Sequence, residues 1–501
     1  MFTNQHLAAI DLGSNSFHMI VVKPSEDGDI KVVDRLRESV RLGSGLDADN
    51  NLSPEAQQRA LACLLRFGER LRGLSSDRVI AVGTNTLRLA NQSRDFIRQA
   101  EMALGHPIAI ISGHEEARLI YLGVAHSLEN ETTTGNRFVM DIGGGSTELI
   151  IGRGLEALYL ESLKMGCVSM TEQFFPEGRL DAPAFKKAIR AAHLPLVPIR
   201  KKYQSLGWET ETGASGTIRT VQKVVQQNGL SPFHITLDHL YTLRDRMIEA
   251  GHTDRLRLAG LSDERKPVFA GGLAILIAVF ESLGIKKMQV SDWALREGLV
   301  YDRLQRSQAS DIRVMAVKNL QSRFGVDVQQ ASAVRQTAEH LFQRCRDDWK
   351  LSAYSQELLS WAAELHEIGL IISHESHQKH GAYLIDNVDL PGFSTEEQHW
   401  LSTLVRMHRS KISTKLFGLL DSKEYQYALY LVVILRLSVL LHRARDTNII
   451  KIERLKAREN SLIVYLAEAN LEDQRPLLVA DLERESELLK AVNFNLNFDT
   501  K

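Results

Sequence analysis

The chain has 501 residues, of which 44% are hydrophobic and 25% are charged, so it is too long for one typical domain and can fill several hydrophobic cores. Its 61 Lys and Arg residues nearly balance 62 Asp and Glu residues, which argues against a nucleic-acid partner and against an acidic partner. Three widely spaced cysteines, Cys63, Cys167 and Cys345, form no CxxC pair, which excludes a disulfide framework and a zinc knuckle and favours the reducing cytosol.

A β-hairpin is the first element that the sequence predicts, over residues 7–22 (LAAIDLGSNSFHMIVV). A similar segment lies at residues 137–152 (RFVMDIGGGSTELIIG). In both segments an apolar strand is followed by an Asp, a turn of small residues and a second apolar strand. The two Asp residues, Asp11 and Asp141, are 130 positions apart, which indicates two α/β halves that each open with the same hairpin.

Strands and helices alternate between the two hairpins. Ser53-Pro54 is a helix-start signal before an amphipathic helix. In chain order we expect a helix at 56–73, a strand at 78–84, a helix at 86–103, a strand at 107–113 and a helix from about residue 114. This order predicts a largely parallel core sheet, and the same alternation returns after the second hairpin.

The pattern changes after about residue 305. Residues 311–441 have helical periodicity almost throughout, and residues 449–469 predict two strands around a turn. No low-complexity linker separates the parts, which predicts packed rather than tethered domains. The expected domains are an α/β subdomain with the first turn (1–125), an α/β subdomain with the second turn (126–305), a helical domain (306–445) and a small α+β domain (446–501).

The two glycine-rich turns suit phosphate binding, because glycine lets phosphate oxygens approach backbone N–H groups closely and hydroxyl groups add donors. The residues expected to bind phosphate are Gly13, Ser14, Asn15 and Ser16 in the first turn and Gly143, Gly144, Gly145, Ser146 and Thr147 in the second. The carboxylates of Asp11, Asp141 and Glu148 are better suited to Mg²⁺, which takes oxygen ligands and bridges carboxylates to substrate phosphates. Mn²⁺ is the alternative ion.

Eight motifs in order carry a resemblance to one family. Between residues 8 and 301 they read AIDLGSNSFHM, TNTLRLA, ISGHEEARLIYLGV, DIGGGSTEL, MGCVS, GASGT, ERKPVFAGGLAIL and ALREGLVY. Together they resemble the exopolyphosphatase / guanosine pentaphosphate phosphohydrolase family, and the helical remainder resembles its long bacterial members. The resemblance implies duplicated α/β domains of the actin, hexokinase and Hsp70 type (ribonuclease H-like), then an all-α HD-like domain and a small α+β C-terminal domain.

The resemblance also implies a reaction, in which water attacks the terminal phosphorus of a phosphoanhydride chain and orthophosphate is released. Glu116 matches the family's catalytic residue, which orients or deprotonates the water, while Glu115 fits an ordinary first-turn glutamate. Arg88 and Arg265 match arginines that face the phosphate chain, where a planar guanidinium binds oxygens bidentately. Residues 213–217 (GASGT) resemble a loop that closes over the substrate, or form a helix-capping turn.

The helical region resembles an HD phosphohydrolase domain with a degenerate metal motif. His366-Glu367, on a helix expected over residues 357–372, stands where the HD pattern has His-Asp, and Ser438 or Val439 stands where a late Asp is expected. A longer side chain displaces the carboxylate, and a lost ligand lowers the coordination number. We therefore expect satisfied histidines in a degenerate scaffold rather than an active second metal centre.

Two substrates follow from the resemblance. The motifs TNTLR, ERKPVF, WAAELHEIGL and TLVRMHR are nearer the exopolyphosphatase branch, so inorganic polyphosphate is the first expected substrate. Guanosine pentaphosphate is the alternative, and it needs a nucleotide pocket near the cleft. An actin- or Hsp70-like ATPase and a protein that only senses polyphosphate are minor alternatives.

The sequence also predicts where the protein acts. Its N-terminus lacks the charged-then-apolar pattern of a signal peptide, and the longest apolar runs, 269–280 and 429–441, are shorter than the roughly 20 residues of a membrane-spanning helix. We expect no transmembrane segment, a cytoplasmic location with peripheral attachment to the inner membrane left open and, from the resemblance to the long members, a homodimer.

Overall fold

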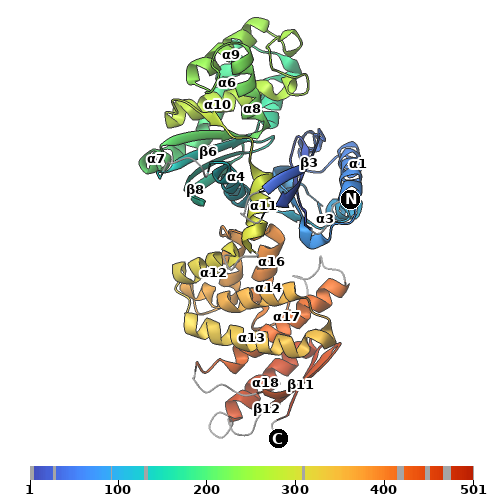
Figure 1. Ribbon diagram of the computed structural model, residues 1–501. Helices are drawn as coiled ribbons and strands as arrows, with labels where there is room; N and C mark the ends of the chain where they lie inside the picture. The colour runs from blue at the N-terminus through green and yellow to red at the C-terminus, as the bar shows by residue number, and fades with distance from the viewer. Residues whose placement is uncertain are drawn as a thin grey trace. The chain divides into compact units, whose positions relative to one another are not determined.

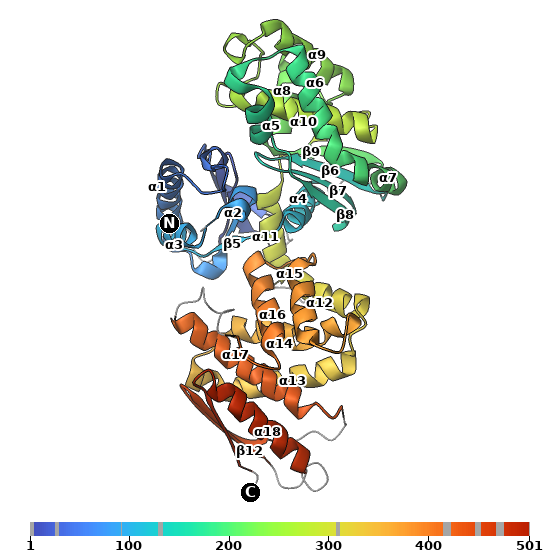
Figure 2. The ribbon, with the colours of Figure 1, turned by 180° about the vertical axis from the view of Figure 1, so that it is seen from behind.

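The computed structural model divides the chain into two compact units, Met1–Ser310 and Asp311–Lys501. Opposite views of the ribbon show strands and helices mixed through the first unit and mostly helices in the second (Figures 1 and 2). The structure describes residues 5–25, 30–91, 93–128, 134–306, 311–413, 422–445, 452–466 and 475–499.

Two five-stranded sheets with the same topology organise the first unit. Their strand orders are β3-β2-β1-β4-β5 and β10-β9-β6-β7-β8. The first contains β1 (Leu7–Leu12), β2 (Phe17–Pro24), β3 (Ile30–Glu38), β4 (Val79–Gly83) and β5 (Ile108–Ile110); the second contains β6 (Arg137–Ile142), β7 (Thr147–Arg153), β8 (Glu156–Leu163), β9 (Thr210–Ala214) and β10 (Gln289–Val290). This repeat confirms the predicted duplicated α/β fold.

The repeat follows from the two hairpins. Strand β1 pairs antiparallel with β2 and parallel with β4, and β6 pairs in the same way with β7 and β9. In this register Asp11 lies opposite His18, and Asp141 lies opposite Glu148. The two halves therefore present the same Asp beside different partners, one an imidazole and one a carboxylate.

The helices of the first half match the prediction with one correction. They are α1 (Pro54–Leu71), α2 (Asn85–Leu89), α3 (Ser93–Leu104) and α4 (Gly113–Ser127). The single helix expected over residues 86–103 is wrong, because the backbone is extended at Ala90 (φ −62°, ψ 122°). The next N–H, of Asn91, donates to the Asn50 carbonyl at 2.8 Å, so it bonds a neighbouring loop instead of continuing α2.

Helix α10 forms the centre of the second half. The helices there are α5 (Cys167–Phe174), α6 (Ala182–His193), α7 (Val197–Leu206), α8 (Ser215–Gln227), α9 (Leu237–Ala250), α10 (Phe269–Leu283) and α11 (Leu295–Arg306). In the described part of the chain one segment, Lys266–Leu283, has the length and hydropathy of a membrane span, and 72% of it is buried inside the protein. A helix that is apolar on all sides and packed in this way is typical of a domain core.

Helices α4 and α11 pack between the two sheets. One apolar core joins them to Leu7 and Ala9 of β1 and to Val139 and Ile150 of the second sheet. The alternate residues of β1 face a different core, formed with α1 and α3. The N-terminus of α4 is therefore positioned by both halves at once.

The two central helices cross in backbone contact at a pair of glycines. A Cβ added to Gly123 of α4 would lie 2.1 Å from the Ala294 carbonyl oxygen, and one added to Gly298 of α11 would lie 1.9 Å from the Leu119 carbonyl oxygen. Both distances are far below van der Waals contact, and the opposing atoms belong to backbone that cannot rotate away. Glycine is therefore required at both positions.

Gly298→Ala is expected to lower the free energy of unfolding of the full chain by about 1–3 kcal/mol, because the added methyl group forces the two helices apart. Thermal or denaturant unfolding measures the change. Arg303→Ala on the same helix is the control, since it alters a half-exposed side chain that bonds only the Asp77 carbonyl among its described partners. A Gly298 variant as stable as this control would contradict the close crossing.

The second unit is mostly helical, as the periodicity of residues 311–441 predicts. Its elements are α12 (Ile312–Arg323), α13 (Val328–Trp349), α14 (Ala353–Leu365), α15 (His377–Asn387), α16 (Thr395–Met407), α17 (Ser422–Leu441), β11 (Ile452–Arg458), β12 (Ser461–Leu466), α18 (Arg475–Lys490) and β13 (Asn495–Asp499). The predicted final hairpin is present as β11 and β12, and residues 449–451 and 467–469 of that prediction lie outside the described residues. One hydrophobic core joins the helices to this small sheet.

The helix expected over residues 357–372 is shorter than predicted. Helix α14 ends at Leu365, and a separate 3₁₀ turn follows at Ile368–Ile371. Gly369 lies in that turn, and a Cβ there would be 2.0 Å from the His377 carbonyl oxygen. The chain therefore passes close to the start of α15, which a continuing α-helix could not do.

Candidate active site

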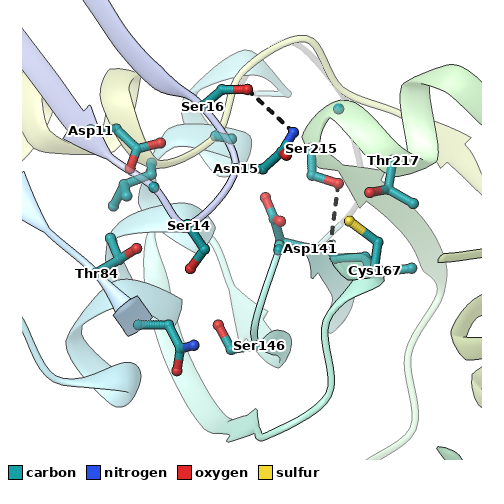
Figure 3. A pocket seen from close by; sticks show the side chains of 18 of the residues that line it. Asp11, Ser14, Asn15, Ser16, Thr84, Asp141, Ser146, Cys167, Ser215 and Thr217 are labelled. Atoms are coloured by element: carbon teal, nitrogen blue, oxygen red, sulfur yellow. Dashed lines mark hydrogen bonds between the residues drawn. The ribbon is translucent and has the colours of Figure 1, made fainter. Parts of the chain in front are cut away.

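The two glycine-rich turns meet where β1 and β6 end. A Cβ added to Gly144 would lie 3.0 Å from the Ser14 Cβ and 3.3 Å from the Asn15 nitrogen, so the two turns are in direct contact. Ser14 of the first turn and Asp141 and Ser146 of the second half line one pocket (Figure 3). Duplication of the hairpin thus produces a single site with a wall from each half.

In each turn, two backbone carbonyl groups accept hydrogen bonds from backbone N–H groups of neighbouring segments. The bonds are Gly43 N–H to Ser14 O and Arg41 N–H to Asn15 O, both at 2.8 Å, and Cys167 N–H to Gly143 O and Val168 N–H to Gly144 O, both at 2.9 Å. These carbonyl oxygens therefore point towards α5 and the loop before α1, away from the cavity. An anion in the cavity meets less negative charge as a result.

A cavity of about 120 Å³ lies between the turns. The predicted residues that line it are Asp11, Gly13, Ser14, Asn15, Ser16, Glu116, Asp141, Gly143, Gly144, Gly145, Ser146 and Arg265. The structure thus brings together both turns, two of the predicted metal ligands and the predicted catalytic carboxylate. Arg88, Thr147 and Glu148 are not among the lining residues.

Glu116 reaches the cavity from the first turn of α4. The hydroxyl of Ser112 caps this helix by accepting the Glu115 N–H at 3.1 Å. The Glu116 carboxylate accepts a hydrogen bond from Arg88 Nη1 at 2.9 Å, and the same Nη1 donates to the Ile111 carbonyl at 2.8 Å. Burial raises the pKa of Glu116, and the Arg88 guanidinium opposes that rise. Arg88 therefore holds the Glu116 carboxylate in position and favours its ionised form, but it does not line the cavity.

Glu115, the neighbouring residue, has a different role. Arg118 donates to both of its carboxylate oxygens at 2.8 Å, and also to Asp302 of α11 at 2.6 Å. This buried network joins α4 to α11. Of the two adjacent glutamates, one faces the cavity and the other holds the helices together.

Thr147 and Glu148 lie behind the second turn. The Thr147 hydroxyl, which is fully buried, donates to the Met165 carbonyl at 2.6 Å. Glu148 is 1% exposed and accepts a hydrogen bond from the Ser162 hydroxyl at 2.8 Å. Burial, with the nearby carboxylates of Glu116 and Asp141, raises the pKa of Glu148 well above its usual value. These two side chains thus support the turn from below the cavity surface.

The carboxylates that line the cavity repel one another. Burial, with the nearby Glu116 carboxylate, raises the pKa of Asp11 to about 7, and the same two causes raise the pKa of Asp141 to about 7. The Arg296 guanidinium opposes both shifts. The pocket therefore concentrates negative charge at a position where a cation would be bound favourably.

The GASGT segment both starts helix α8 and lines the cavity. Ser215 has φ of 78°, a region that non-glycine residues rarely adopt and that is often found at functional sites. Its hydroxyl accepts a hydrogen bond from the Ile142 N–H at 3.4 Å (Figure 3). A Cβ at Gly216 would lie 1.9 Å from Arg265 Nη2, so the glycine leaves room for that guanidinium. The segment starts α8 without a side-chain capping hydrogen bond, and its closure over a substrate stays a prediction.

Sequence reasoning did not single out several of the residues that line the cavity. They are His18, Thr84, Asn85, Cys167, Arg219 and Arg296. All lie in or beside the motifs that carry the resemblance, but a motif does not tell which of its side chains faces the cavity. Burial and several arginines, Arg296 first, lower the pKa of His18 well below its usual value, so this imidazole is neutral.

A histidine-rich pocket lies in the second unit, where the HD-like motif was recognised. His366, Glu367, His408 and Val439 line it. The Nδ1–H groups of His366 and His408 donate to backbone carbonyls at 2.7 and 2.6 Å, and burial lowers the pKa of both rings. The expectation of satisfied histidines is wrong for the other ring nitrogen, because the buried Nε2 atom of each ring has no hydrogen-bond partner among the described residues. Among all residues that the structure describes, no group of three or more His, Cys, Asp and Glu side chains is arranged to hold a metal ion.

A larger cavity of about 620 Å³ adjoins the cavity between the two turns, with which it shares Ser14 and Asn15. Its walls include the apolar side chains of Val168, Phe175, Pro176, Pro267 and Val268, the carboxylates of Glu172, Glu177, Asp254 and Glu264, and the guanidinium of Arg41. Arg37 pairs with one of these carboxylates, that of Glu264, at 2.5 Å. The larger cavity is thus partly apolar and acidic.

Comparison with known proteins gives a consistent result for both units. Residues 21–307 match the Ppx/GppA phosphatase family, and residues 312–486 match domain III of Ppx/GppA phosphatases. An exopolyphosphatase from Cytophaga hutchinsonii is 25% identical, with a TM-score of 0.55, over 60% of this chain and 98% of that one. The PPX-GPPA enzyme of Aquifex aeolicus is 26% identical, with a TM-score of 0.50, over 59% of this chain and 99% of that one.

Proposed function

The chain belongs to the Ppx/GppA phosphatase family, and from this premise we propose that it hydrolyses the terminal phosphoanhydride bond of inorganic polyphosphate and releases orthophosphate. One observation carries the proposal. Glu116 lines the same buried cavity as the two glycine-rich turns, so a carboxylate that activates water and the amides that bind phosphate can act on one phosphorus atom. Phosphate release from polyphosphate by the purified full chain tests it.

The donor set of the cavity fits a hard divalent cation. Asp11 and Asp141 would hold Mg²⁺, because the ion prefers carboxylate oxygens and needs only one or two of them beside water and substrate phosphates. The raised pKa values of both side chains are those of buried carboxylates that lack sufficient counter-charge. When bound, Mg²⁺ supplies positive charge to the phosphate oxygens. Mn²⁺ is an alternative with the same ligand preferences.

The chain's own residues activate the water and stabilise the charge on the phosphate. Glu116 orients the attacking water and takes its proton, while Arg88 and the packing of α4 hold the carboxylate in place. The water oxygen bonds to the terminal phosphorus as the bridging P–O bond breaks. The turn amides and Arg265 face the phosphate oxygens, whose charge they stabilise without reorganising.

Arg88→Gln is expected to shift the acid limb of the pH–rate profile to higher pH by about one unit or more, because the guanidinium lowers the pKa of Glu116 and the base works only when ionised. The profile of kcat/KM for tripolyphosphate between pH 5 and 9 measures the shift. A uniform loss at every pH with an unmoved limb would instead assign Arg88 to phosphate binding.

Guanosine pentaphosphate is the second candidate substrate, and the larger cavity beside the phosphate site favours it. A continuing phosphate chain would meet several carboxylates there, whereas the uncharged guanine base can lie on the apolar wall and donate N–H groups to a carboxylate. The 3′-diphosphate of the same molecule is anionic and would need Arg41, the guanidinium in that wall. Values of kcat/KM measured side by side on polyphosphate and on guanosine pentaphosphate decide between the two. Release from neither would contradict both.

Other properties stay predictions. A homodimer is expected from the resemblance alone, a cytoplasmic location from the cysteine and N-terminal patterns, and peripheral membrane attachment is left open. An actin- or Hsp70-like ATPase is the weaker alternative activity, and it would be supported by ATP hydrolysis that exceeds hydrolysis of both phosphate-chain substrates.

A further inference from the structure

We propose that Arg296 is a further catalytic residue, whose guanidinium contacts the terminal phosphoryl group and stabilises its negative charge in the transition state. The inference rests on the proposed phosphohydrolase function and adds a residue to which no role had been given. It starts from a buried cation that lines the cavity and that has no carboxylate within ion-pair distance among the described residues.

Arg296 lies in the first turn of α11 and lines the cavity together with Ala294 and Leu295. Only 8% of the residue is exposed, so its charge is largely withdrawn from bulk water. A buried guanidinium is costly unless an anion accompanies it. Among the described residues no carboxylate lies within ion-pair distance of Arg296, although three carboxylates line the same cavity.

Two partly buried arginines near the site do have acidic partners. Arg118 pairs with Glu115 and Asp302, and Arg88 pairs with Glu116. Arg296 instead has Nη1 at 3.5 Å from the Nδ1 atom of His18. An imidazole nitrogen can accept this long hydrogen bond and orient the guanidinium without contributing a negative charge. The positive charge of the Arg296 guanidinium is therefore available to an anionic ligand in the cavity.

The position of Arg296 relative to Glu116 is fixed by helix packing. Glu116 is carried by α4 and Arg296 by α11, and these two helices cross in backbone contact at Gly123 and Gly298. The Arg118 bonds to Glu115 and Asp302 join the same helices a second time. The base and the guanidinium are thus held by one rigid pair of helices between the two sheets (Figure 1).

This arrangement suits phosphoryl transfer. Negative charge spreads over the equatorial oxygens while the bridging bond breaks, and a positioned arginine is typically worth 10³–10⁵ in turnover. Once a divalent cation engages the cavity carboxylates, the guanidinium is available to the phosphate oxygens. A planar fork binds two oxygens of one phosphoryl group, which the ammonium group of lysine does not do as well.

The test compares variants of Arg296 with Arg303→Ala, the control on the same helix. Arg296→Gln is expected to lower kcat/KM for tripolyphosphate by about 10³–10⁵-fold, the range of a positioned arginine, and Arg296→Lys to recover only part of that loss. Added guanidinium chloride at low, non-denaturing concentration is expected to raise the activity of Arg296→Ala at least tenfold. The midpoint of thermal unfolding of each variant is measured alongside.

Two outcomes would overturn the proposal. One is an Arg296→Gln variant with kcat/KM within threefold of the control. The other is a loss of activity that guanidinium does not reverse and that a fall in thermal midpoint accompanies, since that combination describes a structural role.

A binding measurement separates this inference from the proposed function. In a Glu116→Gln background, calorimetry with tripolyphosphate and Mg²⁺ reports phosphate binding without turnover. Adding Arg296→Gln is expected to weaken that binding at least tenfold, whereas equal affinity would remove Arg296 from the phosphate. If the wild-type chain hydrolyses neither substrate, the proposed function is wrong and this binding result still decides the place of Arg296.

Discussion

Glu116→Gln is expected to lower kcat on polyphosphate by roughly 10²–10⁴-fold, the usual contribution of a positioned general base. The amide keeps the shape of the side chain but cannot take a proton from water. The substrate should still bind, since the glycine-rich turns and Arg265 are unchanged. Orthophosphate release under saturating substrate measures the effect on kcat separately from KM.

The adjacent residue provides a matched control. Glu115→Gln makes the same chemical change one position away. It weakens the bidentate ion pair with Arg118 and leaves the lining of the cavity unchanged. We expect this variant to lose thermal stability and to retain kcat within about tenfold, because a residue that only supports the helix acts through its position. Normal turnover in Glu116→Gln, or equal loss in both variants, would remove Glu116 from the catalytic role.

Asp141→Asn is expected to have two opposite effects. Activity should fall by about 10³-fold or more, because several kcal/mol of metal-dependent charge stabilisation is lost. The metal-free protein should become more stable at pH 7.5, on the order of 1–3 kcal/mol, because the variant removes a buried carboxylate whose ionisation is unfavourable. Loss of function and gain of stability together identify a carboxylate held in place for a ligand.

The pH dependence gives the sign of the stability effect. In the native state the pKa of Asp141 is about 7, whereas in the unfolded chain it is near its ordinary value of 3.8. Between about pH 4 and pH 7 the native state therefore binds more protons, so the stability of the metal-free protein falls as pH rises through this window. In Asp141→Asn this fall in stability with pH should disappear. In the wild type, added Mg²⁺ should offset the same fall.

Asp302→Asn is the control for this prediction. Asp302 is also buried, but the guanidinium groups of Arg118 and Arg306 lower its pKa. Its ionised form stabilises the native state above its unfolded pKa, so the Asn variant should be less stable at pH 7.5. Denaturant unfolding of both variants without metal measures the difference. A destabilised Asp141→Asn would contradict the uncompensated charge at the cavity.

The sequence predicted the positions of the glycine-rich turns better than it predicted which neighbouring side chains line the cavity. The pattern of an apolar strand, an Asp and small residues is local, and it placed Asp11 and Asp141 in equivalent positions before any contact was known. The same pattern could not place Glu148 below the cavity surface, because burial depends on the sheet and helix that cover it. It also could not predict that α2 ends at Leu89, because the hydrogen bond from the Asn91 N–H to the Asn50 carbonyl that redirects the chain joins residues far apart in the sequence.

The amino-acid sequence by itself predicted the duplicated α/β fold, the helical second unit and the two glycine-rich turns, because strand and helix periodicity and the spacing of glycine and small residues are local features. The family followed from the resemblance of the eight motifs. Tertiary structure decided which of two adjacent glutamates faces the cavity and that Arg88 holds Glu116. It also decided that Arg296 lines the same cavity with no acidic partner in ion-pair distance among the described residues. Glu116 and Arg296 are 180 positions apart in the chain, and only the contact of α4 with α11 between the two sheets brings their charges to one site.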